Sequence, residues 1–407
     1  MVRSPRRLAA ALLGCCLVAD VAAAAWALGF GAHAPTSSPS VQSPTTTATG
    51  VGGATRATGT TATTGAEGPT AAAVTSAPDR ITLAFAGDVH FERAARDLLV
   101  DAEPLTAALR DTIGRADFAM VNLETALGEG GAPLPGKAYA FRAPVSSLDT
   151  LARAGVDAVS MANNHAADFG ADVFAQTLAA RRGAPIPIVG VGRDATEAFT
   201  PLRIDVHGVS VAVLASSQLR EETSRDHAAG PGDPGIATNL DPAPLRRAVR
   251  AAAATSDLVV VMMHWGTPYT GCADDRQRET ARLLAADGAD VIVGGHAHRP
   301  QGSGWLGQSY VAYGMGNFVW YNNEGAGART GVLTVTVDAA AARAEQTRSG
   351  RSRPLVLGGQ WTPMLIGADG VPRSPTSAPA RARLAAGWTE ATRCAGLSGV
   401  VGGPTYG

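Results

Sequence analysis

The stretch ITLAFAGDVH (residues 81–90) is the starting point for predicting the fold. It is an almost wholly apolar run that ends in two side chains able to bind a metal. Residues 81–86 predict a short buried strand, and the glycine that follows opens a loop. Asp88 and His90 are two positions apart, so on an extended strand end their side chains point to the same side. We therefore expect a strand that delivers polar ligands to a site at its carboxyl end.

Similar apolar runs recur along the chain and alternate with helical patterns. Further strands are predicted at residues 118–122, 157–162, 258–264, 289–294 and 310–317. Helices are predicted at residues 94–100, 171–181, 244–254 and 276–286. Residues 203–216 alternate and contain His207-Gly208, which is typical of a hairpin turn. Strands that alternate with helices predict an α/β fold. After residue 337 the pattern weakens, and only residues 355–365 look able to pack.

Polar residues gather where the predicted strands end. Besides the first strand, the strand ends carry Asn122-Leu123-Glu124, Ala162-Asn163-Asn164-His165, His264-Trp265-Gly266, Gly295-His296-Ala297-His298 and Gly316-Asn317-Phe318. The carboxyl ends of parallel strands converge on one crevice, and oxygen and imidazole donors gathered there form a divalent metal site. A single histidine after a strand is more often a packed or hydrogen-bonded residue, so the prediction rests on the ordered combination.

The N-terminal segment predicts membrane targeting. Arg3, Arg6 and Arg7 precede an apolar run, residues 8–30, that contains one charged residue, Asp20. A helix of this length can cross a bilayer, and the flanking arginines orient the rest of the chain outward. We expect an uncleaved single-pass anchor with an extracytoplasmic domain. Cleavage near residues 32–34 and a lipoprotein modification in the LLGC segment (residues 12–15) are the alternatives.

The composition divides the chain into four parts. Residues 1–34 form the signal or anchor, and residues 35–79 form a disordered linker rich in Thr, Ala, Gly, Ser and Pro. Residues 80–340 form the predicted folded α/β domain, and residues 341–407 form a C-terminal extension that packs partly on it. The chain has 34 Lys and Arg against 35 Asp and Glu, which argues against a nucleic-acid partner. Cys272 and Cys394 could form an extracytoplasmic disulfide, and the sequence leaves this pairing open.

In their order, these segments resemble the capsule synthesis protein CapA family, which is associated with poly-γ-glutamate. The resemblance runs from about residue 81 to about residue 337 and includes Tyr139-Ala140-Phe141, Asp168-Phe169-Gly170 and His298-Arg299-Pro300-Gln301. That family belongs to the calcineurin-like metallophosphoesterase superfamily. The resemblance implies a four-layer αββα sandwich with a dinuclear site for two divalent metal ions (Mn, Fe or Zn).

The resemblance also implies roles for individual residues. It assigns one metal to Asp88, His90 and His298 and the second metal to Asn164, His264 and His296. Glu124 stands where the superfamily has a bridging aspartate, and His165 stands where it has the acid that protonates the leaving group. Arg142 follows a family-like phenylalanine and could bind a substrate carboxylate or phosphate, although a solvated surface arginine is an equal alternative. The family commonly has Glu where Pro268 stands, and it often lacks a histidine at position 90.

Two functions are compatible with these residues. The first is a membrane-anchored metallohydrolase that cleaves a phosphoester or an amide in an anionic envelope polymer, in biosynthesis or processing of a capsule of the poly-γ-glutamate type. The second is a non-catalytic accessory factor for export or attachment of such a polymer, as part of a polymer-synthesis membrane complex. A general metallophosphoesterase is a third reading. The expected partners are the anionic polymer or a phosphoester substrate and the membrane.

Overall fold

The computed structural model describes residues 78–344 and 354–403. The predicted anchor and nearly all of the predicted linker lie outside these residues. Within the two described ranges, no helix combines the length and apolar character needed to cross a bilayer.

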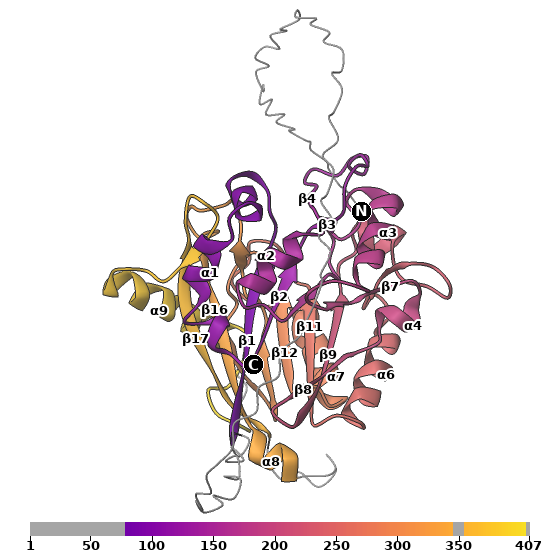
Figure 1. The fold of residues 1–407 in the computed structure, drawn as a ribbon. Coiled ribbons are helices and arrows are strands. Elements are labelled where there is room, and N and C mark those ends of the chain that lie inside the picture. Colours follow the sequence, from indigo (N-terminus) through magenta and orange to yellow (C-terminus); the bar gives the residue numbers. More distant parts are fainter. Residues whose placement is uncertain (1–77, 345–353, 404–407) are drawn as a thin grey trace, which may run out of the picture. The chain divides into compact units, whose positions relative to one another are not determined.

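The larger of two main sheets is mixed and has β1 near its middle (Figure 1). Its strand order is β18-β17-β16-β1-β2-β5-β6, and β15 also pairs with β1. β1 runs parallel to β2 and antiparallel to β16. The strands are β1 (Arg80–Val89), β2 (Phe118–Leu123), β5 (Ala158–Ser160), β6 (Ile188–Val189), β15 (Asn317–Val319), β16 (Arg329–Asp338), β17 (Val356–Ile366) and β18 (Pro372–Arg373).

The second main sheet has the order β13-β14-β12-β11-β9-β8. Its four inner strands are parallel, and β8 and β13 add hairpin edges. The strands are β8 (Leu202–Val206), β9 (Val209–Ser217), β11 (Leu258–His264), β12 (Val291–Gly295), β13 (Ser303–Leu306) and β14 (Ser309–Ala312). Two short pairs lie outside both sheets, namely β3 (Ala126–Leu127) with β4 (Arg142–Ala143), and β7 (Val191–Gly192) with β10 (Gly235–Ile236).

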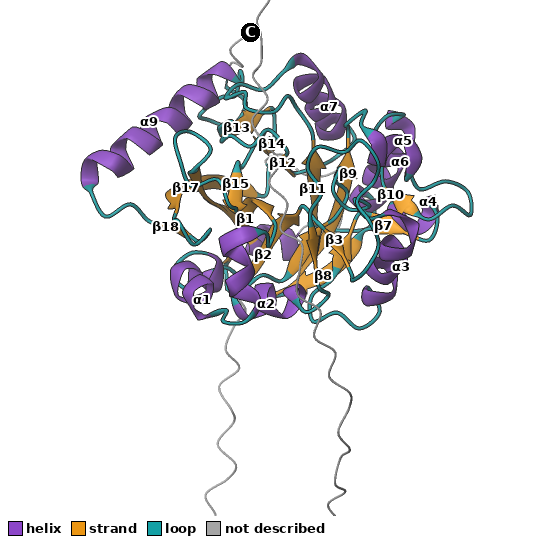
Figure 2. Ribbon diagram, turned by 90° about the horizontal axis from the view of Figure 1, so that it is seen from above, coloured by secondary structure: helices purple, strands orange, loops and turns teal. Residues whose placement is uncertain are grey.

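Helices flank the strands on both sides (Figure 2). They are α1 (Glu103–Leu109), α2 (Ser147–Arg153), α3 (Gly170–Ala180), α4 (Ala195–Ala198), α5 (Glu222–Asp226), α6 (Pro242–Ala253), α7 (Asp275–Ala286), α8 (Ala339–Ala344) and α9 (Ala378–Cys394). A 3₁₀ helix, η1 (Arg93–Leu99), follows β1. Helices α1 and α2 were not predicted from the sequence, because each has only seven residues and a short apolar pattern.

The side chains of β1 alternate between two apolar layers, and this alternation explains how the sheets and helices pack in layers. Leu83 and Phe85 pack between the sheets with residues of β9 such as Val211 and Val213. Ala84 and Ala86 point to the other face, in a cluster that includes residues of α1, α2 and α3. A third cluster joins the outer face of the second sheet to α6 and α7. The period-two alternation of a strand thus produces a helix layer, two packed sheets and a second helix layer.

The predicted mixed α/β character is confirmed, and so is the hairpin at His207-Gly208, which joins β8 to β9. The prediction of one strand at residues 310–317 is wrong. The chain leaves β14 after Ala312 and enters β15 at Asn317, and these two strands belong to different sheets. Glycines allow this crossing, because a Cβ on Gly87 would lie 1.8 Å from the carbonyl oxygen of Gly316.

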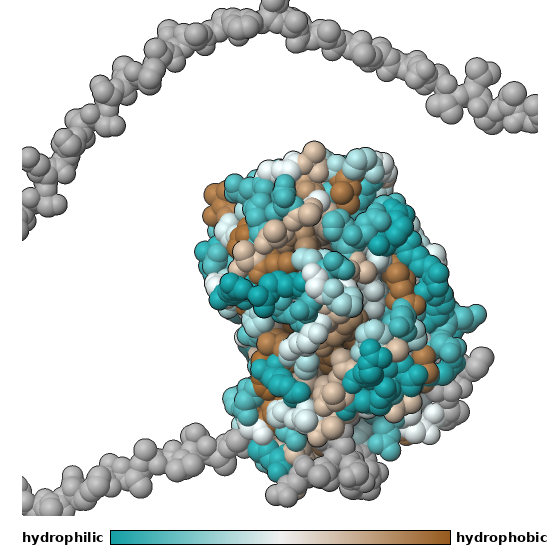
Figure 3. Space-filling view, turned by 90° about the vertical axis from the view of Figure 1, so that its right-hand side faces the viewer, coloured by the Kyte–Doolittle hydropathy of each residue, from teal (hydrophilic) through white to brown (hydrophobic). Residues whose placement is uncertain are grey.

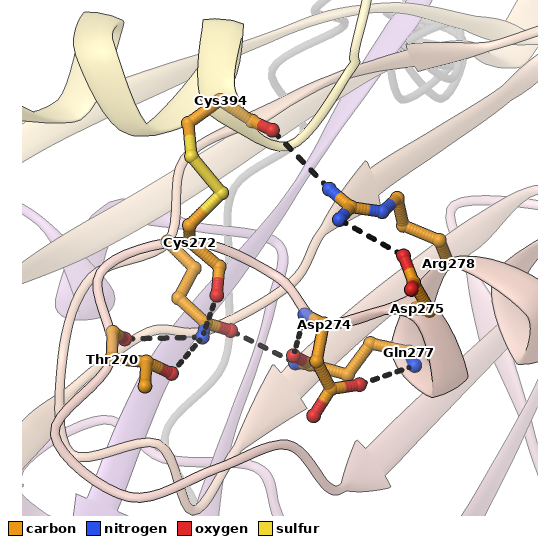
Figure 4. The surroundings of a disulfide bond; sticks show 8 residues. Thr270, Cys272, Asp274, Asp275, Gln277, Arg278 and Cys394 are labelled. Carbon is orange, nitrogen blue, oxygen red and sulfur yellow. Dashed lines mark hydrogen bonds and ion pairs between the residues drawn. A yellow bond between two sulfur atoms is a disulfide. The ribbon is translucent and has the colours of Figure 1, made fainter. Parts of the chain in front are cut away.

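The described C-terminal residues complete the larger sheet. β17 pairs antiparallel with β16 from Arg329 to Val337, and α9 packs on β17. The rings of Trp361 and Trp388 stack there at a centroid distance of 3.8 Å. Cys272 and Cys394, whose pairing the sequence left open, form a disulfide. The disulfide joins the end of α9 to the loop after β11 (Figure 4).

The face beside α4 and α6 bears mainly hydrophilic residues with apolar residues between them (Figure 3). Charged pairs on these helices include Arg246 of α6 with Asp287 and Arg193 with Glu197 of α4. Isolated apolar residues on such a surface are ordinary and need no special role.

Replacing both Cys272 and Cys394 with serine is expected to lower the free energy of unfolding by about 2–5 kcal/mol, because the disulfide closes a long loop in the unfolded chain. The two cysteines are 122 positions apart. Urea denaturation followed by circular dichroism measures this loss. Wild-type protein with a reductant should unfold at the midpoint of the double variant, and an unchanged midpoint in both samples would contradict the prediction.

Candidate functional site

The ends of strands from both sheets meet in one buried cluster. Asp88 stands at the end of β1, Glu124 directly after β2, His264 at the end of β11 and His296 directly after β12. The backbone N–H of His296 donates to the Asp88 carboxylate at 3.1 Å, which joins the second sheet to the first. The predicted convergence of these segments is therefore observed.

Two groups of donor atoms in this cluster have the spacing of metal ligands. The first group is Glu124, His264 and His296, and the second is Asp88, Glu124 and His298. In each group the ligand atoms lie within 4.8 Å of one another. Glu124 belongs to both groups, which is the arrangement expected of a bridging carboxylate. The Oδ1 of Asn164 lies 2.8 Å from Nε2 of His264, so the amide oxygen faces the first group.

Asparagine side chains hold the donors in place. Asn122 donates through Nδ2 to Asp88 Oδ1 at 2.9 Å, and the same nitrogen lies 3.2 Å from Nδ1 of His264. Asn163 donates to Asn122 Oδ1 at 3.1 Å and to the carbonyl of Leu123 at 2.8 Å. Sequence reasoning did not assign Asn122 or Asn163 to the site, although both lie in the strand-end segments that it singled out.

The hydrogen bonds of His298 leave one ring nitrogen free to bind a cation. Asn317 donates its Nδ2 to the carbonyl of Gly327, so its Oδ1 is the atom that faces Nδ1 of His298 at 2.8 Å. His298 must then carry its hydrogen on Nδ1, which leaves the lone pair on Nε2. Both His296 and His298 adopt left-handed backbone conformations, with φ of 81° and 52°. Such strained conformations cluster at functional sites.

His90 is a member of neither donor group. Its ring packs against Trp320, Phe141 and Tyr321, with centroid distances of 3.9, 4.6 and 4.8 Å. The N–H of Glu92 donates to Nδ1 of His90, so the neutral ring carries its hydrogen on Nε2. Nε2 of His90 is buried and has no hydrogen-bond partner. The role of His90 as a metal ligand stays a prediction.

His165 is held by a buried chain of charged groups. Its Nδ1 lies 2.6 Å from Asp168 Oδ2, which also accepts from the N–H of Phe141 at 2.7 Å. Lys137, the only lysine of the chain, pairs with the other oxygen of Asp168 and donates to the carbonyl of Asn164. Nε2 of His165 lies 3.7 Å from Glu124 Oε1. Lys137 and Asp168 were not predicted as site residues, and the single lysine was the available signal.

Burial dominates the electrostatics of the cluster. It lowers the pKa of His264, His296 and His90 well below the ordinary value and lowers that of His165 to a smaller extent. Burial raises the pKa of Glu124, and the neighbouring Asp88 raises it further. The imidazoles are therefore neutral at pH 7, which is the state that binds metals.

The residues present fit a bound cation. Glu124 Oε1 and His296 Nδ1 are buried and have no hydrogen-bond partner. Unpaired buried polar atoms are costly, and a cation among them would satisfy both. Mixed carboxylate, amide and imidazole donors suit Mn, Fe or Zn.

An open cavity of about 270 Å³ adjoins the cluster. His165 and His298 line it together with an aromatic wall that includes Phe141, Trp320 and Tyr321. Arg93 also lines this cavity and brings a positive charge to it. Its guanidinium lies 4.5 Å from the centre of the Tyr321 ring.

Two further residues differ from the sequence-based expectation. Arg142 does not line the cavity, because its guanidinium donates to the carbonyl of Gly130 and lies over the ring of Phe169. Its predicted role in substrate binding stays a prediction. Glu221, which sequence reasoning missed, accepts a hydrogen bond from Asn164 at 2.7 Å and lies 3.9 Å from Nε2 of His296. It follows β9 without any motif that would have singled it out.

Gly295→Ala is expected to weaken metal binding by about 10–100-fold, the range seen when a group that orients a ligand is disturbed. A Cβ at this position would lie 2.5 Å from Asp88 Oδ1 and 3.4 Å from Nδ1 of His264. Titration of the metal-free protein with Mn²⁺ measures the change. Gly183→Ala is the matched control, because a Cβ there meets no atom within 4 Å. Equal affinity in both variants would contradict the prediction.

The metal-free protein is expected to lose stability as the pH falls from about 7.5 to about 5.5. The buried imidazoles have lowered pKa values, so below about 6.5 the unfolded chain binds more protons than the folded one. Glu124 has a raised pKa, so its protonation stabilises the folded state as the pH falls. The four imidazoles with lowered pKa values outnumber this one carboxyl, so the net effect is a loss of stability. Urea midpoints measured with a chelator present test this, and His264→Asn should flatten the slope. A midpoint that rises on acidification would refute it.

Comparison with known proteins gives the family. Residues 82–322 match the family described as bacterial capsule synthesis protein PGA_cap. The chain is 32% identical over 163 residues to the PGA biosynthesis protein CapA of Bacillus subtilis, a region that covers 40% of this chain and 42% of that protein. It is 28% identical over 211 residues to a probable polyglutamine synthesis accessory protein of Mycobacterium tuberculosis, covering 50% and 55% of the two chains.

The aligned regions thus span about half the length of these curated relatives. A solved structure described as a novel phosphatase from Mycoplasma pneumoniae has a TM-score of 0.45 and 14% identity, covering 73% of this chain and 95% of that one. Similarity this low says nothing about activity. The family match, by contrast, covers more than half of the chain and contains the whole strand-end cluster, so the protein belongs to the bacterial capsule synthesis protein family PGA_cap, the family of CapA.

Proposed function

We propose that this protein is a metal-dependent hydrolase with a calcineurin-like dinuclear site, and that it acts on an anionic capsule polymer of the poly-γ-glutamate type. The observation that carries the proposal is the pair of donor groups that share Glu124 and lie beside His165. The name of the Bacillus subtilis relative, a PGA biosynthesis protein, supports the polymer class.

Residues of the two donor groups would hold the cations. Asp88, Glu124 and His298 would bind one ion, and Glu124, His264 and His296, with Asn164, would bind the other. When bound, such ions supply Lewis-acid stabilisation of the negative charge that develops on the reacting group. The hydrogen bond that Asn122 donates to Asp88 and the one that Asn317 accepts from His298 keep these ligands aimed at the cations.

His165 moves the proton in this proposal. Asp168 accepts a hydrogen bond from Nδ1, so the neutral ring presents its lone pair at Nε2. The pKa of His165 lies below its ordinary value, mainly because of burial, so the ring is neutral before the reaction starts. Nε2 can therefore take up a proton and deliver it to the departing oxygen or nitrogen. Lys137 balances the charge of Asp168 and fixes its position.

The open cavity is the proposed binding place for the reacting segment of the polymer. Its aromatic wall can pack on the chain of the substrate, and the guanidinium of Arg93 can pair with an anionic group. The predicted helix at residues 8–30 would hold this site on the outer face of the membrane, within reach of a polymer-synthesis complex.

A non-catalytic role in export or attachment of the polymer is the second candidate. It is favoured by the word accessory in the name of the mycobacterial relative. In that role the metal cluster would be a structural or binding element, and the proton-transfer function of His165 would be dispensable. A general phosphoesterase is distinguished from both by its substrate.

His165→Ala is expected to lower the hydrolysis rate by at least about 100-fold, because a positioned general acid or base contributes that much or more. The metal content should stay at the wild-type level, since His165 belongs to neither donor group. The assay uses Mn²⁺-loaded full-length protein with poly-γ-glutamate and, separately, with a chromogenic phosphodiester.

His207→Ala is the control, because this histidine is half-exposed and pairs with Asp117 away from the cluster. Loss of polymer cleavage in His165→Ala alone supports the hydrolase. Cleavage of the phosphodiester but not of the polymer would favour a general phosphoesterase. No turnover of either substrate by the wild-type protein would refute the hydrolase and leave the accessory role.

A further inference from the structure

A second and larger cavity lies between α9 and the larger sheet. Its volume is about 590 Å³, and the disulfide of Cys272 and Cys394 forms part of its wall. The stacked rings of Trp361 and Trp388 form another part. Neither the metal cluster nor His165 lines it.

This cavity carries positive charge without a balancing carboxylate. Arg299, Arg329 and Arg383 line it, and among the described residues none of the three forms an ion pair. Its acidic lining residue is Glu390, whose carboxylate pairs with Arg393. Like charges held together without a counter-ion are a feature of anion-binding sites.

Two buried polar atoms in the wall have no partner. They are Nε of Arg299 and Oγ1 of Thr330, and Thr330 is only 1% exposed. A buried polar atom without a partner costs free energy, and both atoms belong to residues that line this cavity. Arginine pairs best with carboxylate or phosphate, because its planar donors match two oxygens at once.

The cavity adjoins the one beside the metal cluster. Tyr269 lines both, and its N–H donates to the carbonyl of Ala297 at 2.7 Å. Arg299 directly follows His298, which belongs to the second donor group. The disulfide joins the loop after β11 to α9, so the boundary between the cavities is covalently tied to the outer wall (Figure 4).

We propose that the arginine cavity binds carboxylate groups of an extended polyanion whose reacting bond lies in the cavity beside the metal cluster. The inference rests on the proposed function, and it deepens that function by assigning a second subsite that recognises more than one repeat of the polymer. A ligand that occupies both cavities must be a chain, since a small molecule in either cavity would not reach the other set of charged groups. Substrate length and carboxylate content thus become recognition features.

Binding of a fluorescent decameric γ-glutamyl oligomer to full-length, Mn²⁺-loaded protein tests this proposal. Arg299→Gln and Arg329→Gln should each weaken binding by about tenfold or more, because each removes a charge-assisted hydrogen bond. γ-Glutamylglutamate fills one cavity at most, so it should bind the wild-type protein at least about tenfold more weakly than the decamer does. Arg110→Gln is the matched control, since this exposed arginine directly after α1 lines neither cavity.

The anisotropy measurement uses the His165→Ala background, so it reports binding without turnover. Arg329 is exposed, so its replacement should not disturb folding, which circular dichroism verifies. Decamer affinities in both arginine variants equal to the control would overturn the inference. Equally tight binding of poly(glycerol phosphate) would overturn the carboxylate assignment. Arginine-dependent decamer binding, combined with no hydrolysis of the polymer by the wild-type protein, would keep this subsite and refute only the proposed hydrolase.

Discussion

The buried carboxylate of Asp88 is the interaction on which the site depends. It stands at the end of β1, accepts hydrogen bonds from Asn122 of β2 and from the backbone of His296 after β12, and lies 3.4 Å from Nδ1 of His298. The first two donors come from different sheets, so this carboxylate holds the two sheets in register at the one edge where ligands collect. Gly87 and Gly295 lack side chains on either side of it, because a Cβ at either position would collide with this junction.

The cluster gathers groups that strain the folded state without a cation. Burial penalises the charge on Glu124 and disfavours protonation of His264 and His296. Unpaired buried atoms on Glu124 and His296 add to this cost. A bound cation would offset the free-energy cost of burying these polar groups. Packing alone would favour apolar residues at the same positions. The hydrogen-bonded chain through Lys137, Asp168 and His165 differs from this cluster, because each buried charge in the chain has a partner.

Much of this site was predictable because its ligands occupy the first positions after strands. The order of polar segments identified Asp88, Glu124, Asn164, His264, His296 and His298, and the structure brings them together. His90 was predicted as a metal ligand, and Arg142 as a possible substrate contact. In the structure the ring of His90 packs against Trp320 and the guanidinium of Arg142 lies over the ring of Phe169, and side-chain directions of this kind depend on tertiary packing. Arg93 begins η1 and Glu221 directly precedes α5, but neither stands in a motif that marks a site, and contacts between distant segments leave no periodic signal.

The sequence by itself determined the alternation of strands and helices, the family and the strand-end ligands, since these follow from local periodicity and from short ordered motifs. Only the tertiary structure decided that residues 310–317 divide between two sheets and that β17 pairs with β16. It also decided that Cys272 meets Cys394 and that Arg299 and Arg329 share a cavity. Each of these depends on residues that are distant in the chain, and their proximity is set by how the sheets and α9 pack.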